Sequence, residues 1–418
     1  MPRVVRRKKL SCPQLASYFR DAFRPRADWL VGIELETMGL DAATGRPLAY
    51  DGPNPNVRAL IESYAALRGG ALIREGANPI GIDGSWGGIS LEPGGQFEWS
   101  ARPMPTLDAL AAELDGHLAA SAAIARELGV RWLDVAVQPD AAVGDMPWMP
   151  KARYGIMREI MARRGRLAHR MMTQTASIQC AFDYASDDDW TRKFRAAALL
   201  APVAVALFAN SSRVDGRDSG FASYRQAIWR ETDPDRCDLP DVVFDPAFGI
   251  DAWVEWACDV PTLFLQRGQG LVASGGEPFR SLMQCAGCDG VAMEDWELHL
   301  SSIFTEVRSY SYIEVRSADL QPPPLILAVP SLWTGLLYDD GALDEALALG
   351  RPFDDPAAWR RGMDAAARAG LAASVNGVDL GPLASRVVAL ASRSLRSEAG
   401  IQVLSKLARA RELPAGAR

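Results

Sequence analysis

The sequence is poor in residues on which several protein classes depend. Only six cysteines and three histidines occur among 418 residues. So few cysteines do not form a disulfide scaffold, so we expect a reducing, cytoplasmic location. Cys285 and Cys288 form a CxxC pattern, but no second CxxC or suitably spaced histidine pair accompanies it. We therefore expect a surface loop with free thiols and no structural zinc, with redox regulation as the alternative.

Several other sequence signals are also missing. The longest apolar run, Ala196 to Ala209, is shorter than the roughly 20 residues that a membrane-spanning helix needs, and it contains Pro202. It predicts a buried helix, and we expect no membrane partner. Neither a GxxxxGK[ST] phosphate loop nor a GxSxG nucleophile elbow occurs, which excludes these routes to phosphate binding and ester hydrolysis. The start of the chain does not resemble a secretory leader.

Charge and composition limit the remaining possibilities. The 45 basic and 52 acidic side chains give a net charge of -7, and 48% of the residues are hydrophobic. This balance excludes disorder and a generally basic nucleic-acid binder, so we expect no nucleic-acid partner. No repeat or low-complexity linker divides the chain. We predict one domain over residues 1–418, in which a flexible basic tail (1–25) leads in and residues 341–418 form a helical C-terminal part.

Helical periodicity is clearest in four segments, and residues 153–164 are a further candidate helix. Thr106 and Asp187 are the predicted N-caps of two of them, because Thr and Asp side chains accept hydrogen bonds from the first helical turn. The predicted helices span residues 57–67, 106–128, 153–164, 187–209 and, as one helical stretch, 355–411.

Strand-like segments between these helices alternate apolar and polar side chains. In WLVGIELET, Glu34 and Glu36 share one face. In GGISLEPGGQFEWS, Glu92 and Glu98 share a face, and we expect Pro93-Gly94-Gly95 to bend or bulge this strand. In SYSYIEVRSAD, Glu314 and Arg316 point the same way, and Gln179 lies on the polar face of SIQCAFD.

Carboxylates gather on these polar faces without lysine. A single such face is usually a solvated side of an antiparallel sheet. Like charges held side by side repel, however, unless a cation lies between them. Glu34, Glu36, Glu92, Glu98 and Glu314 supply the hard oxygen ligands that Mg²⁺ accepts, with open positions left for nucleotide phosphates. The pattern favours a metal-bridged phosphoryl-transfer site.

Several motifs together resemble one family. They are GIELET (32–37), SLEPGGQFE (90–98), MPKARYGIMREIM (149–161), LFANS (207–211), IW..TDPDRC (228–237), HLSSIFTEVR (299–308), YIEVR (312–316) and WTGLLYDD (333–340). In this order they resemble glutamate-cysteine ligases of the plant and proteobacterial type, together with the related actinobacterial enzyme of ergothioneine synthesis.

The resemblance implies a fold, an activity and two cofactors. The implied α+β fold is a curved antiparallel β-sheet with helices packed on its convex face, similar to the catalytic domain of glutamine synthetase. The implied enzyme is an ATP- and Mg²⁺-dependent ligase that phosphorylates the γ-carboxylate of L-glutamate. The amine of L-cysteine then displaces phosphate and gives γ-glutamylcysteine. Its partners would be these small molecules, and it would act as a monomer or homodimer.

The resemblance also implies roles for single residues. Glu34, Glu36, Glu98 and Glu314 match the metal-holding positions, and Glu92 is a further ligand or a neighbouring acceptor. Gln179 would reach metal or nucleotide, and Arg316 would clamp phosphate. Arg308 and Arg225 are candidates for binding substrate carboxylates or transferring phosphate, with a salt bridge to a neighbouring acid as their structural alternative.

This chain departs from the family pattern at two site strands. Leu35 replaces a histidine, and we expect only a packing change because it points to the apolar side. Ala181 replaces an asparagine on the polar face, so a substrate group that the amide would contact loses its partner. The acceptor amine is therefore less certain than glutamate phosphorylation. A different amine acceptor is the first alternative function, and a non-catalytic ligand-binding relative is the second.

Overall fold

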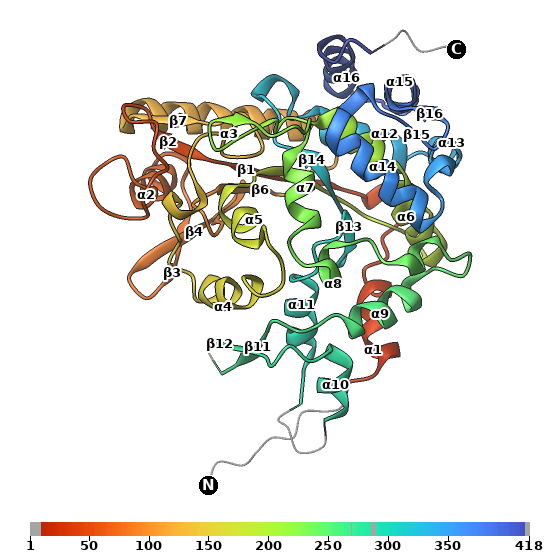
Figure 1. The fold of residues 1–418 in the computed structure, drawn as a ribbon, viewed down its shortest axis with the longest axis horizontal. Helices are drawn as coiled ribbons and strands as arrows, with labels where there is room; N and C mark the ends of the chain where they lie inside the picture. The colour runs from red at the N-terminus through yellow and green to blue at the C-terminus, as the bar shows by residue number, and fades with distance from the viewer. Residues whose placement is uncertain (1–9, 269, 286–289, 414–418) are drawn as a thin grey trace.

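A sheet of eight antiparallel strands forms the centre of the computed structural model, which describes residues 10–268, 270–285 and 290–413 (Figure 1). The strand order is β13-β14-β8-β1-β6-β5-β4-β3. The strands are β1 (Val31–Thr37), β3 (Ala71–Glu75), β4 (Asn78–Gly84), β5 (Gly87–Leu91), β6 (Phe97–Ala101), β8 (Ser177–Phe182), β13 (Val307–Ser309) and β14 (Ile313–Asp319).

Shorter strands pair outside this sheet. They are β2 (Gly39–Asp41) with β7 (Val130–Trp132), β9 (Arg213–Val214) with β10 (Arg217–Asp218), β11 (Phe264–Arg267) with β12 (Gly270–Ala273), and β15 (Ser374–Val375) with β16 (Val378–Asp379).

Helices make up most of the remaining structure. The α-helices are α1 (Cys12–Arg20), α2 (Val57–Arg68), α3 (Leu107–Leu128), α4 (Ala152–Met161), α5 (Ala168–Gln174), α6 (Asp187–Phe208), α7 (Tyr224–Arg230), α8 (Pro234–Cys237), α9 (Ile250–Asp259), α10 (Phe279–Gln284), α11 (Met293–Leu300), α12 (Ala328–Leu337), α13 (Asp340–Leu349), α14 (Pro356–Ala369), α15 (Leu380–Ser394) and α16 (Glu398–Ala410).

The apolar side chains of the sheet face a layer of helices. Leu35, Trp99 and Ile178 alternate with the polar residues of their strands, and each is completely buried. Helix α12 packs against β1 and β8, α6 against β14, α3 against β6 and α2 against β4. The predicted α+β class, an antiparallel sheet covered by helices, is confirmed. The apolar half of each strand is thereby removed from water, and the polar half is left for a site.

The predicted helices form, with corrections at their ends. Thr106 caps α3 and accepts a hydrogen bond from the Ala109 amide. Asp187 is not an N-cap; it is the first residue of α6, and Ser186 caps that helix because its hydroxyl accepts from the Asp189 amide. The stretch from residue 355 is three helices, α14, α15 and α16, and not one.

Two further predictions about local structure are wrong. Pro93-Gly94-Gly95 does not bend one strand; it lies in the turn between β5 and β6, which pair as antiparallel neighbours. The segment predicted as a flexible tail contains α1, which packs against α9 and buries Leu15 and Phe19. Burial of these apolar side chains stabilises an ordered helix. The basic residues at positions 1–9 lie outside the described residues.

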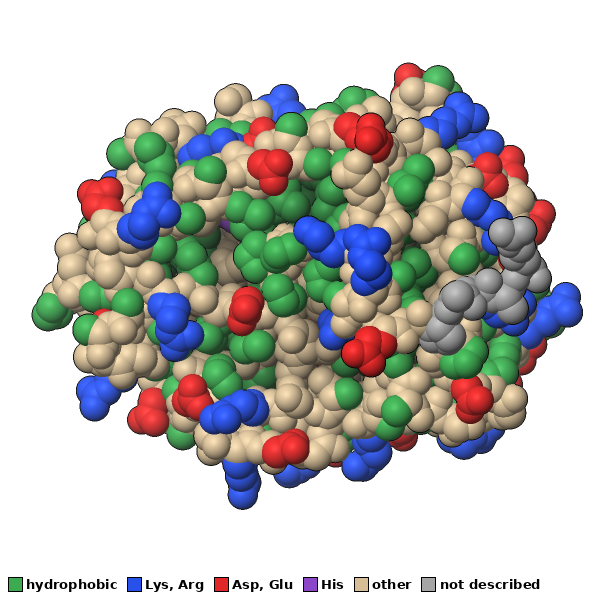
Figure 2. Space-filling model, turned by 90° about the horizontal axis from the view of Figure 1, so that it is seen from above, with side chains coloured by type: hydrophobic (Ala, Val, Ile, Leu, Met, Phe, Trp, Pro, Cys, Tyr) green, Lys and Arg blue, Asp and Glu red, His purple; other side chains and the backbone are tan. Residues whose placement is uncertain are grey.

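The structure also bears on the predictions about the cysteines, membrane-spanning helices and surface charge. Cys285 is disulfide-bonded, so the prediction of a free thiol is wrong there, whereas Cys288 lies outside the described residues. Within the described ranges, no helix is long and apolar enough to cross a membrane. On the face seen in Figure 2, acidic and basic side chains are interspersed. That face has no broad field of one sign.

Candidate active site

Strand register brings acidic side chains from separate parts of the sequence onto one face of the sheet. Glu36 on β1 lies directly opposite Glu98 on β6. Glu34 lies opposite Gln179 on β8. Directly opposed side chains in an antiparallel pair have Cβ atoms about 5 Å apart. The alternation in four sequence segments therefore becomes one acidic surface.

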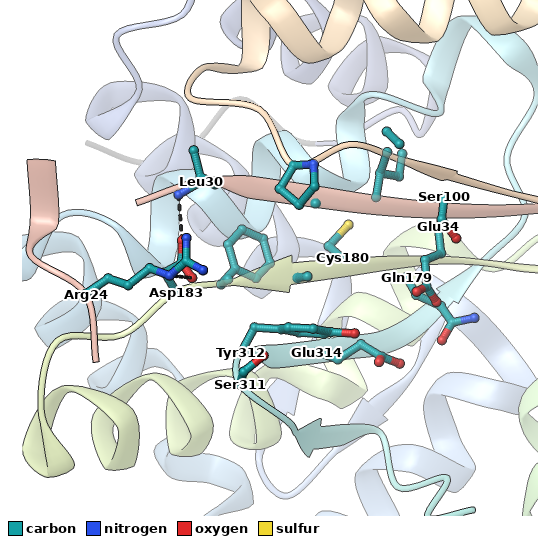
Figure 3. A pocket seen from close by; sticks show the side chains of 16 residues that line it. Arg24, Leu30, Glu34, Ser100, Gln179, Cys180, Asp183, Ser311, Tyr312 and Glu314 are labelled. Atoms are coloured by element: carbon teal, nitrogen blue, oxygen red, sulfur yellow. Dashed lines mark hydrogen bonds and ion pairs between the residues drawn. The ribbon is translucent and has the colours of Figure 1, made fainter. Parts of the chain in front are cut away.

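Two adjoining pockets open on this face. The first, which we call the carboxylate pocket, has about 860 Å³ of empty space. Its lining includes Glu34, Glu36, Glu92, Glu98, Gln179, Arg308 and Arg316. The second, the small-residue pocket, has about 690 Å³ and is lined by Gly32, Ala181, Tyr312 and Glu314 among others (Figure 3). Glu34 and Gln179 line both pockets, so the two are compartments of one site.

Glu314 is held between two arginines. Its Oε1 accepts from Nε of Arg308 at 3.0 Å and from Nη1 of Arg316 at 2.5 Å. Burial disfavours the carboxylate charge, but the two guanidinium groups outweigh burial and lower the pKa of Glu314. Its Oε2 is buried and has no partner among the described residues. A charged carboxylate oxygen without a donor is costly, and a cation would satisfy it.

Three other glutamates of the site, Glu34, Glu36 and Glu98, have raised pKa values. Burial, followed by the charge of Glu314, raises the pKa of Glu34 to about 7. Burial and the charge of Glu92 raise the pKa values of both Glu36 and Glu98. These groups repel one another when charged, so a bound divalent cation would be stabilised strongly here.

The donor set fits Mg²⁺ in chemistry but does not form a finished cage. Carboxylate and amide oxygens are the ligands that Mg²⁺ prefers. Within the described residues, however, no three His, Cys, Asp or Glu side chains converge as metal ligands. Side-chain rotation on a shared face is therefore needed to bring Glu34, Glu36 and Glu98 onto one ion.

Glu92 reaches the same pocket from the turn after β5. The Tyr154 hydroxyl donates to Glu92 Oε1 at 3.0 Å, and it lies 2.7 Å from the Leu91 carbonyl. Lys151 Nζ donates to Ser90 Oγ and to the Leu91 carbonyl, both at 2.9 Å. Lys151 and Tyr154 thus fix the turn that carries Glu92. Sequence reasoning assigned no role to them, although both stand in MPKARYGIM.

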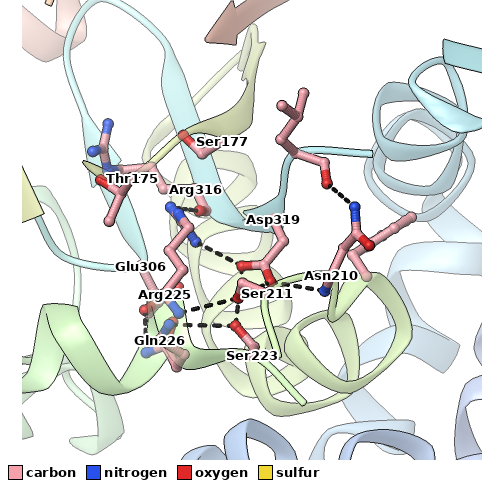
Figure 4. Close-up of polar contacts among 12 residues, drawn as sticks. Thr175, Ser177, Asn210, Ser211, Ser223, Arg225, Gln226, Glu306, Arg316 and Asp319 are labelled. Atoms are coloured by element: carbon pink, nitrogen blue, oxygen red, sulfur yellow. Dashed lines mark hydrogen bonds and ion pairs between the residues drawn. The ribbon is translucent and has the colours of Figure 1, made fainter. Parts of the chain in front are cut away.

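Arg225 has a different place from the other arginines. It is 3% exposed and does not line either pocket of the site. Its Nη2 donates to the Arg316 carbonyl at 3.0 Å, and its Nη1 lies 3.7 Å from Asp319 Oδ1 (Figure 4). Asp319 also accepts from Ser211 Oγ at 2.7 Å. Arg225 therefore supports the backbone of β14 near the end of that strand, which matches the salt-bridge alternative.

Comparison with known proteins agrees with the resemblance seen in the sequence motifs. The family model described as "Glutamate-cysteine ligase family 2(GCS2)" matches residues 30–413. A chloroplastic glutamate-cysteine ligase of Brassica juncea is 39% identical over 350 residues, 83% of this chain and 67% of that protein. The corresponding Arabidopsis thaliana protein is 38% identical, over 83% of this chain and 66% of its own. This chain thus spans about two thirds of the length of these plant relatives.

A solved structure shares the fold. Glutamate-cysteine ligase from Francisella tularensis, determined in complex with AMP, superposes with a TM-score of 0.54 at 12% identity and covers 94% of this chain and 84% of its own. The family match makes the protein an ATP-dependent ligase, and the polar sheet face lined by carboxylates and arginines suits that class. The chain belongs to glutamate-cysteine ligase family 2.

Proposed function

We propose that the protein joins the γ-carboxylate of L-glutamate to the amine of L-cysteine, with conversion of ATP to ADP and phosphate. The row of glutamates facing Arg308 and Arg316 carries this proposal. Phosphorylation of a carboxylate brings two anions together, and cationic groups offset their repulsion. Plant relatives at about 38% identity are named glutamate-cysteine ligases, which supports the same reaction.

Mg²⁺ is the second cofactor in this proposal. Glu34, Glu36, Glu98 and Glu314 would hold it, with Glu92 as a further ligand or as a neighbouring acceptor. The bound ion supplies charge neutralisation between the nucleotide phosphates and the substrate carboxylate. The unpartnered Oε2 of Glu314 supports this assignment.

Arg316 is the better placed of the two pocket arginines to hold a phosphate. Among the described residues, only its Nη1 donates, to Glu314 and Gln179, so its other nitrogens remain for phosphate oxygens. Arg308 uses Nε and Nη2 for Glu314 and Nη1 for the Ile303 carbonyl. We assign it to orienting Glu314 and to balancing charge in the pocket. Gln179 links Arg316 to the Glu36 side of the pocket.

Acceptor selection belongs to the small-residue pocket in this proposal. Ala181 and Gly32 are direct partners across β8 and β1, and a Cβ added to Gly32 would lie 3.0 Å from that of Ala181. The absence of a side chain at Gly32 and the single methyl group of Ala181 leave room beside Glu34. The acceptor amine would approach the phosphorylated carboxylate in this space. Another amine acceptor is the remaining alternative because Ala181 offers no hydrogen bond. A single catalytic domain, a monomer or homodimer, and a cytoplasmic location remain predictions.

A phosphate-release assay tests the activity. The protein is incubated with ATP, Mg²⁺ and L-glutamate against a panel of amines, and the products are identified by mass spectrometry. We expect γ-glutamylcysteine as the main product. Strong preference for another amine would replace cysteine but keep the phosphorylation step. Absence of phosphate release across the panel by folded protein would contradict the proposed reaction.

A further inference from the structure

A third cavity lies beside the carboxylate pocket. Trp229 on α7 lines both of them. The cavity, which we call the tryptophan cavity, has about 460 Å³ of empty space, and its lining includes Trp229, Trp359, Gln226 and Glu306. One face of the Trp229 ring is taken by Arg316, whose guanidinium carbon lies 5.7 Å from the ring centroid. Neither the proposed reaction nor the metal assignment uses this cavity.

Glu306 is a buried carboxylate with an unused oxygen. It is 7% exposed, and its Oε1 accepts from Gln226 Nε2 at 2.7 Å (Figure 4). Its Oε2 has no hydrogen-bond partner within the described chain. Arg308 and Arg316, the nearby arginines in sequence, pair with Glu314 instead. Glu306 thus lacks a counter-ion among the residues that the structure describes.

Gln226 adds a second unused acceptor. A carboxylate only accepts hydrogen bonds, so the amide nitrogen of Gln226 must face Glu306. The amide oxygen is left over; it is buried and has no partner in the described residues. Gln226 is 3% exposed. Two adjacent acceptors on residues that line one cavity call for a hydrogen-bond donor there, because unpaired buried acceptors are unfavourable.

The aromatic walls suit a positive charge. Trp359 is 3% exposed, and its indole N–H donates to the Ala198 carbonyl at 2.8 Å. It therefore offers the cavity only aromatic carbon. Tryptophan rings attract ammonium groups through their electron-rich faces. Arg230, at the edge of the cavity, already pairs with Asp364 at 2.5 Å, so it is not a free anion-binding group.

A transition-metal site does not fit this lining. Cys237 also lines the cavity, but burial raises the pKa of its thiol, and the thiolate is the form that binds metal. Two free oxygens are also too few for Mg²⁺ or Ca²⁺, which take about six oxygen ligands. An ammonium group carries three donors and one positive charge, which match two acceptors and one unpaired carboxylate.

We propose that the tryptophan cavity binds the primary ammonium group of a small ligand, with Glu306 as its counter-ion and Gln226 as its second acceptor. The ligand is a simple alkylamine or an amino acid. Binding there places a positive charge next to Trp229, which lines both the tryptophan cavity and the carboxylate pocket. The proposal does not depend on the ligase reaction, so failure of one leaves the other testable.

Saturation-transfer NMR with methylammonium and the full-length protein tests the site. Glu306→Gln keeps the shape and removes the charge, and we expect it to reduce the transfer signal at least tenfold. Glu62→Gln removes an exposed charge from α2 and should leave the signal unchanged. Glu98→Gln, in the carboxylate pocket, should keep most of it. A signal lost with Glu98→Gln but kept with Glu306→Gln would overturn the proposal.

Further arms identify the ligand and guard against misfolding. Glycine in place of methylammonium tests for an amino acid, and a stronger glycine signal would assign that source. No methylammonium signal from the wild-type protein would overturn the ammonium assignment. If Glu306→Gln fails to unfold cooperatively, Cys237→Met serves as the second variant. It narrows the cavity without changing charge, and an undiminished signal from it would contradict binding there.

Discussion

Replacing Glu314 by glutamine is the sharpest test of the site. The carboxylate Oε1 accepts from Nε and Nη2 of Arg308, at 3.0 and 2.9 Å, and from Nη1 of Arg316 at 2.5 Å. The glutamine amide oxygen can still accept some of these hydrogen bonds. The two buried guanidinium groups, however, lose the negative charge of the Glu314 carboxylate that both of them face. Breaking a buried ion pair costs about 3–5 kcal/mol. We expect the low end, about 3 kcal/mol, because Glu34 lies nearby and ionises more readily when Glu314 is neutral.

The effect on turnover should exceed the effect on folding. Loss of one preorganised charged group in an active site lowers kcat by about 10²–10³, and Glu314→Gln also removes the free Oε2 assigned to the metal. We expect phosphate release with ATP, glutamate and cysteine to fall at least a thousandfold in protein that still unfolds cooperatively in urea. Glu345→Gln breaks a half-exposed pair with Arg393 and should cost at most about 1 kcal/mol and no activity. Turnover of Glu314→Gln within tenfold of wild type would refute its assigned role.

Four other predictions follow from the same structure. Ala181→Asn should change KM for the acceptor amine several-fold and KM for ATP little; equal changes in both would count against an acceptor pocket. Tyr154→Phe removes the hydrogen bond to Glu92 and should raise the Mg²⁺ concentration for half-maximal activity about tenfold, measured by metal titration; an unchanged titration would show that Glu92 needs no support. Saturating Mg²⁺ should raise the Tm of wild type, and Glu98→Gln should reduce that rise; calorimetry showing the same rise in both would place the ion elsewhere. Burial lowers the pKa of His117 to about 3 from 6.5. Below pH 6.5 the unfolded chain therefore binds a proton at His117 that the folded protein does not. The folded protein loses free energy of unfolding as the pH falls below 6.5. His117→Gln should therefore lose about 2 kcal/mol less than wild type between pH 7 and 5, and parallel denaturation curves would contradict this.

Alternation along single strands was enough to predict which side chains share the polar face. Glu34 and Glu36 were separated correctly from Leu35 because side chains in a strand alternate between two faces. The same rule placed Glu98 and Glu314 on the polar faces of their strands. The strand order was not predictable, because it depends on contacts between distant segments. The carboxylates on these polar faces, which carry no lysine, suggested that the strands meet around a cation, and the family resemblance implied the same.

Other parts of the site depend on geometry that no local pattern records. Glu92 shared the parity of Glu98 in the sequence, but it lies in a turn, so its access to the pocket depends on Tyr154. Arg225 resembled the pocket arginines in residue type, yet it pairs with Asp319 at the end of β14 and lines neither pocket of the site. Glu306 lies in the same motif as Arg308, but only the position of Gln226 reveals its unused oxygen. A buried polar group is defined by its neighbours, which the sequence does not give.

The contact of Arg225 with the Arg316 carbonyl has a consequence for genetic screens of this protein. In a library scored only by growth or product yield, substitutions of Arg225 and Arg316 would have similar effects. Loss of Arg225 removes its hydrogen bond to the Arg316 carbonyl and so displaces β14, which carries Arg316. Measuring ligand affinity and thermal tolerance for each allele would separate them. Changes at either arginine would lower thermal tolerance, because Arg316 pairs with buried Glu314. If Arg316 holds phosphate as proposed, its changes would lower nucleotide affinity much more than changes at Arg225.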